Sequence, residues 1–150
     1  MKVIEHHTWI VTTDSNTCRI YKSTTKPYQL TFVKELLHPE SKLKDTELTS
    51  SAPGRFNSAS NVRGAYTQQT DPKEIEIDHF AREIAEELNS GRNHHDYDQL
   101  IIVAPPHMNG LLLQHMDKNV NHLITQNIKN DVMHLTEQKL SNFLQENLAK

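Results

Sequence analysis

Short apolar runs separated by turn-forming residues dominate the first forty positions of the chain. Three such runs, rich in β-branched and aromatic residues, are Thr8–Thr12, Cys18–Tyr21 and Leu30–Val33. Turn residues at Asp14-Ser15-Asn16 and around Lys26-Pro27 separate them. Runs of this length and composition are typical of strands joined in hairpins. The pattern predicts an antiparallel meander of three strands.

A helical pattern begins after Thr70. We expect Asp71 to cap a helix that has Pro72 at its first position and Glu74 as the reciprocating acid. The helix should run to about Asn89 and end at Gly91. Its apolar stripe, which should pack on a sheet, comprises Ile77, Phe80, Ala81, Ile84, Ala85 and Leu88.

The rest of the chain predicts a buried strand followed by two more helices. The run Leu100–Ala104 is continuously apolar, as in a central strand that is covered on both faces. A helix is expected from about Gly110 to Ile128 and a short strand around Val132-Met133. A last helix should begin at the capping residue Thr136. It carries Leu140, Phe143, Leu144 and Leu148.

The order β-β-β-α-β-α-β-α predicts an α/β fold with three α/β/α layers and a mixed five-stranded sheet. This order is similar to the ribonuclease H-like and ribosomal-protein-like folds. The chain has 150 residues and no internal repeat or linker, so we expect a single domain over residues 1–150. The region His38–Thr70 is the exception to this compact arrangement, because its sequence has no clear helical or strand periodicity. Loops of this length are uncommon unless they are functional or disordered.

Composition and charge limit the cellular location and the partners that we expect for the protein. The formal net charge is −3, which argues against nucleic-acid binding through a broad basic surface. Cys18 is the only cysteine, so no disulfide forms within the chain. The sequence has no secretory pattern and no apolar run of the roughly 20 residues that a membrane span needs. We therefore expect a cytoplasmic protein with no membrane partner.

Four blocks of the sequence resemble the signature blocks of the bacterial host-attachment protein family, in the same order and at similar spacing. The resemblance extends from about Trp9 to Leu148. It implies a core similar to the catalytic domain of the archaeal and eukaryotic peptide-release factors, in which a Gly-Gly-Gln loop promotes peptidyl-tRNA hydrolysis. The blocks are His38–Asp45, Ala52–Arg55, Thr70–Glu74 with Phe80–Ala85, and Leu100–Pro106 with Gly110–Leu112.

The chain departs from the release factors at their decisive motif. Its glycines are Gly54, Gly64, Gly91 and Gly110, so it contains no Gly-Gly pair. We therefore do not expect hydrolysis of the release-factor type. Because no export signal or surface anchor is visible, we do not expect direct adhesion either.

The stretch from Ser50 to Thr70 is the first candidate binding region. It has Arg55 and Arg63 and no acidic residue. The arginines could bind phosphates, and aromatic rings in the same stretch could stack on bases. The partner would be RNA, in the ribosome or as tRNA, or another anionic partner. The alternative is a flexible or self-packed loop whose arginines form ion pairs with carboxylates of the domain. The other candidate residues here are Phe56, Tyr66, Gln68 and Gln69.

The second candidate lies where the buried strand meets the next helix. Pro105, Pro106 and His107 stand at a place where open α/β sheets often bind anions or small ligands. The alternative is a proline stop with Asn109 as the helix cap. A hydrolase of esters or phosphates, with His107 and Asp45 taking part, is the competing hypothesis of function.

No metal site, cofactor or catalytic constellation stands out. Among ten histidines, His115 and His122 lie seven apart on a predicted helix, about 10 Å along its axis, which is too far to share one zinc ion. His79 with Glu76 and Glu83 has helical spacing, which solvated ion pairs explain.

The chain has no CxxC, HExxH or Gly-x-Ser-x-Gly motif, and no base can be assigned to Cys18, which should be a buried apolar residue. The first and central strands lack nuclease carboxylates. We expect a non-catalytic or weakly catalytic binding module. A third hypothesis is an oligomeric structural protein with Ile75 and Leu111 at its interface.

Overall fold

The computed structural model describes residues 6–23, 29–38 and 71–148. Within them one mixed sheet has the strand order β3-β2-β1-β4-β5. β1, β2 and β3 form the predicted antiparallel meander, and β4 runs parallel to both β1 and β5. The strands are β1 (Thr8–Thr13), β2 (Thr17–Ser23), β3 (Thr31–Leu37), β4 (Gln99–Ala104) and β5 (Ile124–Lys129).

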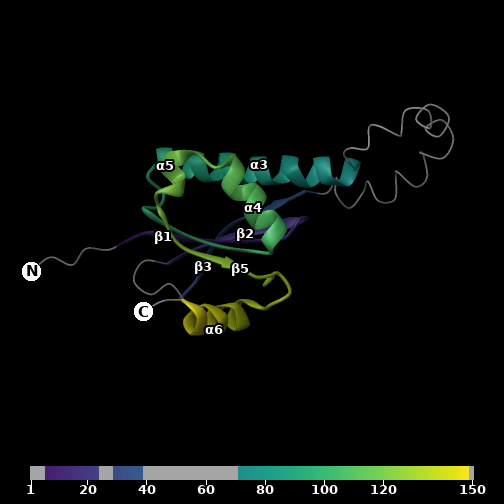
Figure 1. Cartoon of the computed structure of the whole chain (residues 1–150). Helices are drawn as coiled ribbons and strands as arrows, with labels where there is room; N and C mark the ends of the chain where they lie inside the picture. Colours follow the sequence, from purple (N-terminus) through teal and green to yellow (C-terminus); the bar gives the residue numbers. More distant parts are fainter. Residues whose placement is uncertain (1–5, 24–28, 39–70, 149–150) are drawn as a thin grey trace, which may run out of the picture.

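Helices cover both faces of the sheet, so the predicted α/β class with three layers is confirmed. α3 (Pro72–Asn93), α4 (Pro106–His115) and the short α5 (Lys118–Asn121) lie on one face. α6 (Glu137–Asn147) lies on the other face (Figure 1).

Alternate side chains of the inner strands β1 and β4 point to opposite faces of the sheet and therefore belong to two different apolar clusters. Trp9, Val11, Leu100 and Ile102 point to the cluster under α3 and α4. Their sequence neighbours point to the cluster under α6, and these include Ile10, Ile101 and Val103. β4 is buried on both faces as predicted, but the middle strand of the sheet is β1. Strand position depends on pairing, which the apolar run alone does not encode.

The start of α3 is confirmed and its predicted end is wrong. The Asp71 carboxylate accepts a hydrogen bond from the Lys73 backbone N–H at 3.0 Å, and Pro72 is the first helical residue. The helix passes through Gly91 and ends at Asn93, where His95 takes the left-handed conformation at φ 62°. Gly91 serves packing instead, because an added Cβ would stand 2.8 Å from the Trp9 ring.

The expected helix from Gly110 to Ile128 is wrong. α4 starts earlier, at Pro106, and ends at His115; Asp117 then caps α5 by accepting from the Asn119 N–H at 2.8 Å. The chain turns into β5 at Ile124. The four-residue spacing of Ile124 and Ile128 suggested a helix. In the structure both residues lie on β5, where a register shift beside Leu100 lets them face the two different clusters.

The predicted strand at Val132-Met133 is absent from the described structure and that position forms a turn. The Met133 N–H donates to the Asp131 carboxylate at 3.1 Å, and Val132 is buried in the cluster under α6. The last helix is confirmed, because Thr136 caps α6 by accepting from the Lys139 N–H at 3.1 Å. None of the described helices has the length and apolarity to cross a membrane.

Candidate functional site

Strand ends and helix starts meet at one edge of the sheet. The parallel strands β1, β4 and β5 end there, at Thr13, Ala104 and Lys129. The end of β3 reaches the same edge, because Leu37 pairs with Thr17 at the start of β2. We call this the carboxyl edge. α4 begins there directly after β4, and contacts described below bring the start of α3 to it (Figure 1).

The β1–β2 turn at this edge is held by one carboxylate. Asp14 Oδ1 accepts hydrogen bonds from the N–H groups of Asn16 and Thr17 at 2.8 and 2.9 Å. The Thr13 hydroxyl donates toward the Thr17 carbonyl at 2.9 Å. The nearest acid to the end of β1 is therefore engaged in forming the turn. This fixes the turn against which the next strand end packs.

His38, directly after β3, joins the turn to α3. Its backbone N–H donates to the Asn16 carbonyl at 3.0 Å. Its ring stacks on Phe80 with centroids 5.0 Å apart, and its Nε2 lies 3.2 Å from Glu76 Oε1. Nδ1 faces Glu83 Oε1 at 4.0 Å. The two glutamates stand on the same side of α3, two turns apart, so one histidine lies against both.

The opposite flank of α3 meets α4 through a second histidine. His107 Nε2 lies 3.0 Å from Glu74 Oε1, and 60% of the His107 side chain is exposed. Glu74 was expected to return its carboxylate to the Asp71 cap. Instead its backbone N–H bonds the Asp71 carbonyl at 2.9 Å while its carboxylate reaches α4. The start of α3 thus carries a histidine contact on each flank.

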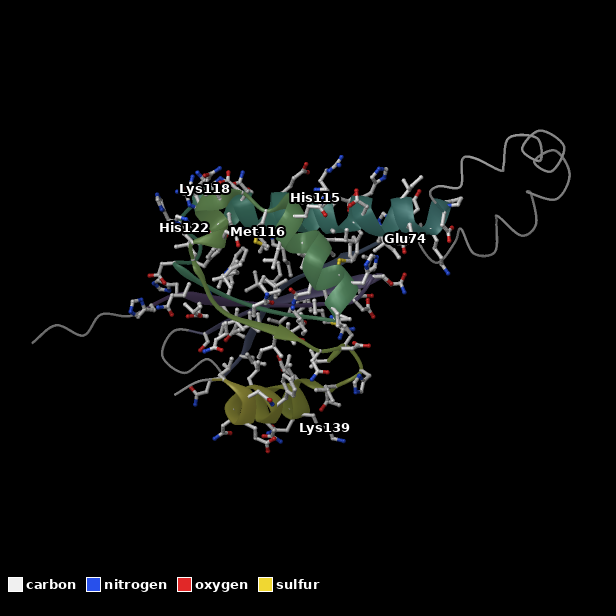
Figure 2. The ribbon with its side chains drawn as sticks, in the orientation of Figure 1. Glu74, His115, Met116, Lys118, His122 and Lys139 are labelled. Carbon is white, nitrogen blue, oxygen red and sulfur yellow. The ribbon has the colours of Figure 1, made fainter. Side chains whose placement is uncertain are left out.

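A third histidine–carboxylate pair lies further along the same two helices. His115 Nε2 is 2.7 Å from Asp78 Oδ1, and Arg82 approaches the other oxygen of Asp78 at 3.9 Å. Figure 2 labels Glu74 near the start of α3 and His115 beside the middle of the α3–α4 layer. This pair differs from His107–Glu74 in burial, because only 16% of the His115 side chain is exposed.

The junction of β4 and α4 is built by prolines and an amide pair. Pro105 occupies the cap position without a side-chain hydrogen bond, and Pro106 is the first helical residue. Asn109 is not the cap. It is fully buried in the helix, where its amide exchanges hydrogen bonds of 2.7 and 3.0 Å with the Asn127 amide of β5. The pair ties α4 to the edge strand.

The structure places part of the predicted site. Pro105, Pro106 and His107 lie at the carboxyl edge as the sequence suggested. His38 contacts α3 at the same edge, and Asp71, which directly follows the first candidate region in the sequence, caps that helix. The remaining predicted residues lie outside the described residues: Asp45, Arg55, Phe56, Arg63, Tyr66, Gln68 and Gln69.

The sequence did not indicate the role of His38. Glu76 and Glu83 were assigned to ion pairs around His79, yet both face His38, and His79 is exposed. His38 is 38 positions from Glu76, so no local spacing could reveal the contact. The available signal was the seven-residue spacing of the two glutamates, which puts them on one side of a helix.

Metal and thiol chemistry find little support in the described residues. No group of three or more histidine, cysteine, aspartate or glutamate side chains there could hold a metal ion. Burial raises the pKa of the Cys18 thiol from 9.0 to about 12, a change that a hydrogen bond with Thr13 partly opposes. Because the thiolate is the reactive form, Cys18 is poorly suited to nucleophilic chemistry. The prediction of a buried cysteine is confirmed.

Comparison with protein families decides where the chain belongs. The profile described as "Protein required for attachment to host cells" matches residues 9–144. This chain belongs to the host-attachment family. The match begins within β1 and ends within α6, and the resemblance seen in the sequence is confirmed. No curated protein matches the sequence of this host-attachment protein.

Solved structures similar to this host-attachment protein are distant. An archaeal translation termination factor, aRF1, is 11% identical with a TM-score of 0.48, over 93% of this chain and 38% of that chain. A non-polymerisable pCBH ParM quadruple mutant is 9% identical with a TM-score of 0.49, over 96% and 48%. An Aquifex aeolicus PPX-GPPA enzyme is 12% identical with a TM-score of 0.38, over 84% and 36%. The chain spans less than half the length of these proteins.

Proposed function

We propose that this host-attachment protein is a binding module of the cytoplasmic translation apparatus, which engages RNA through residues 50–70 and does not hydrolyse it. The partner would be the ribosome or tRNA. The carboxyl edge would supply the rigid base for the contact, and binding would not require a broad basic surface.

The observation that supports the proposal is that two histidines of the carboxyl edge, His38 and His107, both contact the start of α3. His38 precedes the first region and lies 3.2 Å from Glu76. His107 marks the second region and lies 3.0 Å from Glu74. Glu74 and Glu76 are only two positions apart on one helix. The end of β3 and the start of α4, which are far apart in the sequence, thus meet within one turn of α3, as expected of a composite binding edge.

Composition supports an anionic partner. Residues 50–70 contain Arg55 and Arg63 and no acidic residue. Arginine binds phosphate with its planar fork of donors, and bases stack on aromatic rings such as those of Phe56 and Tyr66. The overall charge of −3 keeps other surfaces from binding RNA indiscriminately.

The test is association of the purified protein with ribosomes and with labelled single-stranded poly(U) RNA. Replacing Arg55 and Arg63 by alanine should weaken both associations. If each arginine contacts one phosphate, the slope of log K against log salt should fall by about 0.7 per arginine.

The matched control replaces Arg82 and Lys118, two exposed cations of the described helices, and changes the charge by the same amount. It should bind RNA as the wild type does. An unchanged affinity of the Arg55/Arg63 variant, or no association of the wild type with either probe, would contradict the proposal.

A second candidate function is hydrolysis of an ester or phosphate at the carboxyl edge. The observation in its favour is the exposed His107–Glu74 pair, since a carboxylate that holds one ring nitrogen can orient the imidazole as a general base. His107→Gln should then abolish turnover of generic esterase and phosphatase substrates, whereas His115→Gln should not. Absence of turnover by the wild type would remove this candidate.

A further inference from the structure

We propose that Asn109 is a modification site, at which the side-chain amide is lost by deamidation when the start of α4 separates from β5. The site consists of Asn109, Gly110 and Asn127, and the proposal is independent of the proposed function because it needs no partner. Asn109-Gly110 is the only Asn-Gly pair in the chain. The reaction would turn a transient opening of the α4–β5 contact into a permanent change.

An Asn-Gly pair in a flexible chain carries two groups that react with each other. The backbone nitrogen of Gly110 loses its proton and forms a bond to Cγ of Asn109, and the Cγ–Nδ2 bond breaks as ammonia leaves. Water then opens the resulting five-membered imide at either of its carbonyl carbons, which leaves aspartate or isoaspartate at position 109. Glycine favours this ring closure because it has no Cβ to hinder its own nitrogen.

The folded structure holds both reacting groups in other contacts. Asn109 and Gly110 lie inside α4, where helical hydrogen bonding directs the Gly110 N–H to the Pro106 carbonyl. The Asn109 side chain is fully buried. Its Nδ2 donates to Asn127 Oδ1 at 2.7 Å, and its Oδ1 accepts from Asn127 Nδ2 at 3.0 Å. Closure of the imide therefore requires that the first turns of α4 unwind and that the amide pair break.

The start of α4 is weakly capped. Pro105 occupies the cap position without a side-chain hydrogen bond, so the first turn lacks the contact that a capping side chain gives. His107, in the same turn, has 60% of its side chain exposed. Segments with weak local contacts open more readily than the core. The Asn109–Asn127 pair joins this part of α4 to β5, so it controls the opening that the reaction needs.

The product of the reaction does not fit the closed structure. Aspartate at position 109 places an acceptor oxygen where Nδ2 now donates, 2.7 Å from Asn127 Oδ1. Its negative charge is unfavourable at this buried position, because the neutral Asn127 offers no opposite charge. Isoaspartate adds a methylene to the main chain and interrupts the hydrogen-bond repeat of α4. The modified helix would not close again on β5, and the contact of His107 with Glu74 would be weakened.

The experiment follows the peptide that contains Asn109 by mass spectrometry while the full chain is incubated at mildly alkaline pH. The folded fraction is checked by circular dichroism, and the same incubation in urea gives the rate of the unfolded chain. Folded wild type should react at least about tenfold more slowly than unfolded wild type. Asn127→Ala should react about tenfold faster than folded wild type, the equivalent of about 1.4 kcal/mol of easier opening. The milder change Asn127→Ser should give an intermediate rate.

Thr125→Ala is the matched control on the same strand. The Thr125 hydroxyl donates to the Leu100 carbonyl of β4 at 3.4 Å, so its loss leaves the contact between α4 and β5 intact and the rate unchanged. Gly110→Ala tests the chemistry, because an added Cβ at this position meets no atom within 4 Å in the fold. This variant should lose most of the reaction even in urea, where the helix no longer protects the amide.

Asn109→Asp tests the consequence of the reaction, because it installs one of the two products. It should unfold at a lower urea concentration than the wild type, and an unchanged midpoint would show that the product still fits. Equal rates for folded and unfolded wild type, or the wild-type rate in both Asn127 variants, would overturn the proposal. Equal acceleration by Thr125→Ala and Asn127→Ala would overturn it as well, because the effect would then be a general loss of stability.

Discussion

The environment of Cys18 determines how reactive its thiol is. Its thiol is fully buried on β2, in the cluster under α3 and α4. Burial raises the pKa of the thiol to about 12. Below pH 9 the thiol is protonated in both the folded and the unfolded chain. Between pH 9 and about 12 only the unfolded chain releases the proton, so the stability of the fold declines as the pH rises.

Replacement of Cys18 by alanine should reduce this sensitivity to alkali. Raising the pH from about 8 to about 10.5 should lower the free energy of unfolding of the wild type by about 2 kcal/mol more than that of Cys18→Ala. Urea titrations at the two pH values measure the difference. Burial also raises the pKa of Tyr21 and of Tyr97, but both proteins share these groups and their effect cancels. Equal pH sensitivity of the two proteins would contradict the burial of the thiol.

Single residues were predictable from the sequence where their role is local. Asp71 and Thr136 were recognised as helix caps because a cap acts on residues two or three positions away. Cys18 was recognised as buried because it lies in an apolar run. His38 and Asn109 were not recognised, because their partners Glu76 and Asn127 are distant in sequence and chosen only by the tertiary fold.

Two glycines within helices differ in what surrounds them. An added Cβ at Gly91 of α3 would stand 2.8 Å from the Trp9 ring and 3.1 Å from the Tyr97 ring. An added Cβ at Gly110 of α4 meets no atom within 4 Å. Trp9 and Tyr97 pack on each other with centroids 4.8 Å apart, so neither ring can move freely.

Alanine at these two positions should therefore have opposite effects. Gly110→Ala should stabilise the protein by about 0.5–1 kcal/mol through helix propensity. Gly91→Ala gains the same propensity but forces the rings apart, at a cost of about 1–3 kcal/mol, and should be destabilising on balance. Thermal unfolding of the two variants measures both effects. A stabilised Gly91→Ala would mean that α3 does not approach β1 this closely.

Whole elements were predictable where one pattern had one interpretation. The meander, α3, β4 and α6 were each identified, since their periodicity and their caps agree. The region after Gly110 was misassigned, because the spacing of Ile124 and Ile128 suits a helix as well as a strand with a shifted register. The connection at Pro105-Pro106-His107 was identified as a candidate site, but its contact with α3 through Glu74 was not, because that contact depends on the tertiary fold.

The two apolar clusters of the molecule share the same strands. Ile10, Ile101 and Val103 serve the cluster under α6, and the residues between them serve the cluster under α3. Neither cluster can lose its packing without disturbing β1 and β4. We expect the clusters to unfold together as one cooperative unit.

Leu144→Ala tests this coupling. Leu144 belongs to α6 and its side chain is fully buried, so its truncation should cost about 2–5 kcal/mol. Trp9 lies in the opposite cluster and provides a fluorescence signal there. The transitions followed by Trp9 fluorescence and by circular dichroism should shift to lower denaturant by the same amount. A Trp9 transition that stays in place would show that the two sides unfold separately.

The parallel pairing of β1 with β4 also bears on how the chain folds. Thr8 meets Gln99 across 91 positions, so the central seam of the sheet closes only after a large loop has been brought together. Such non-local contacts slow folding, and we expect the meander and α3 to form before this seam. Loop-closure entropy grows only with the logarithm of length, so residues 39–70 add about 0.4 kcal/mol to the closure of this seam. The fold can therefore accommodate a segment of this length between β3 and α3 at almost no thermodynamic cost.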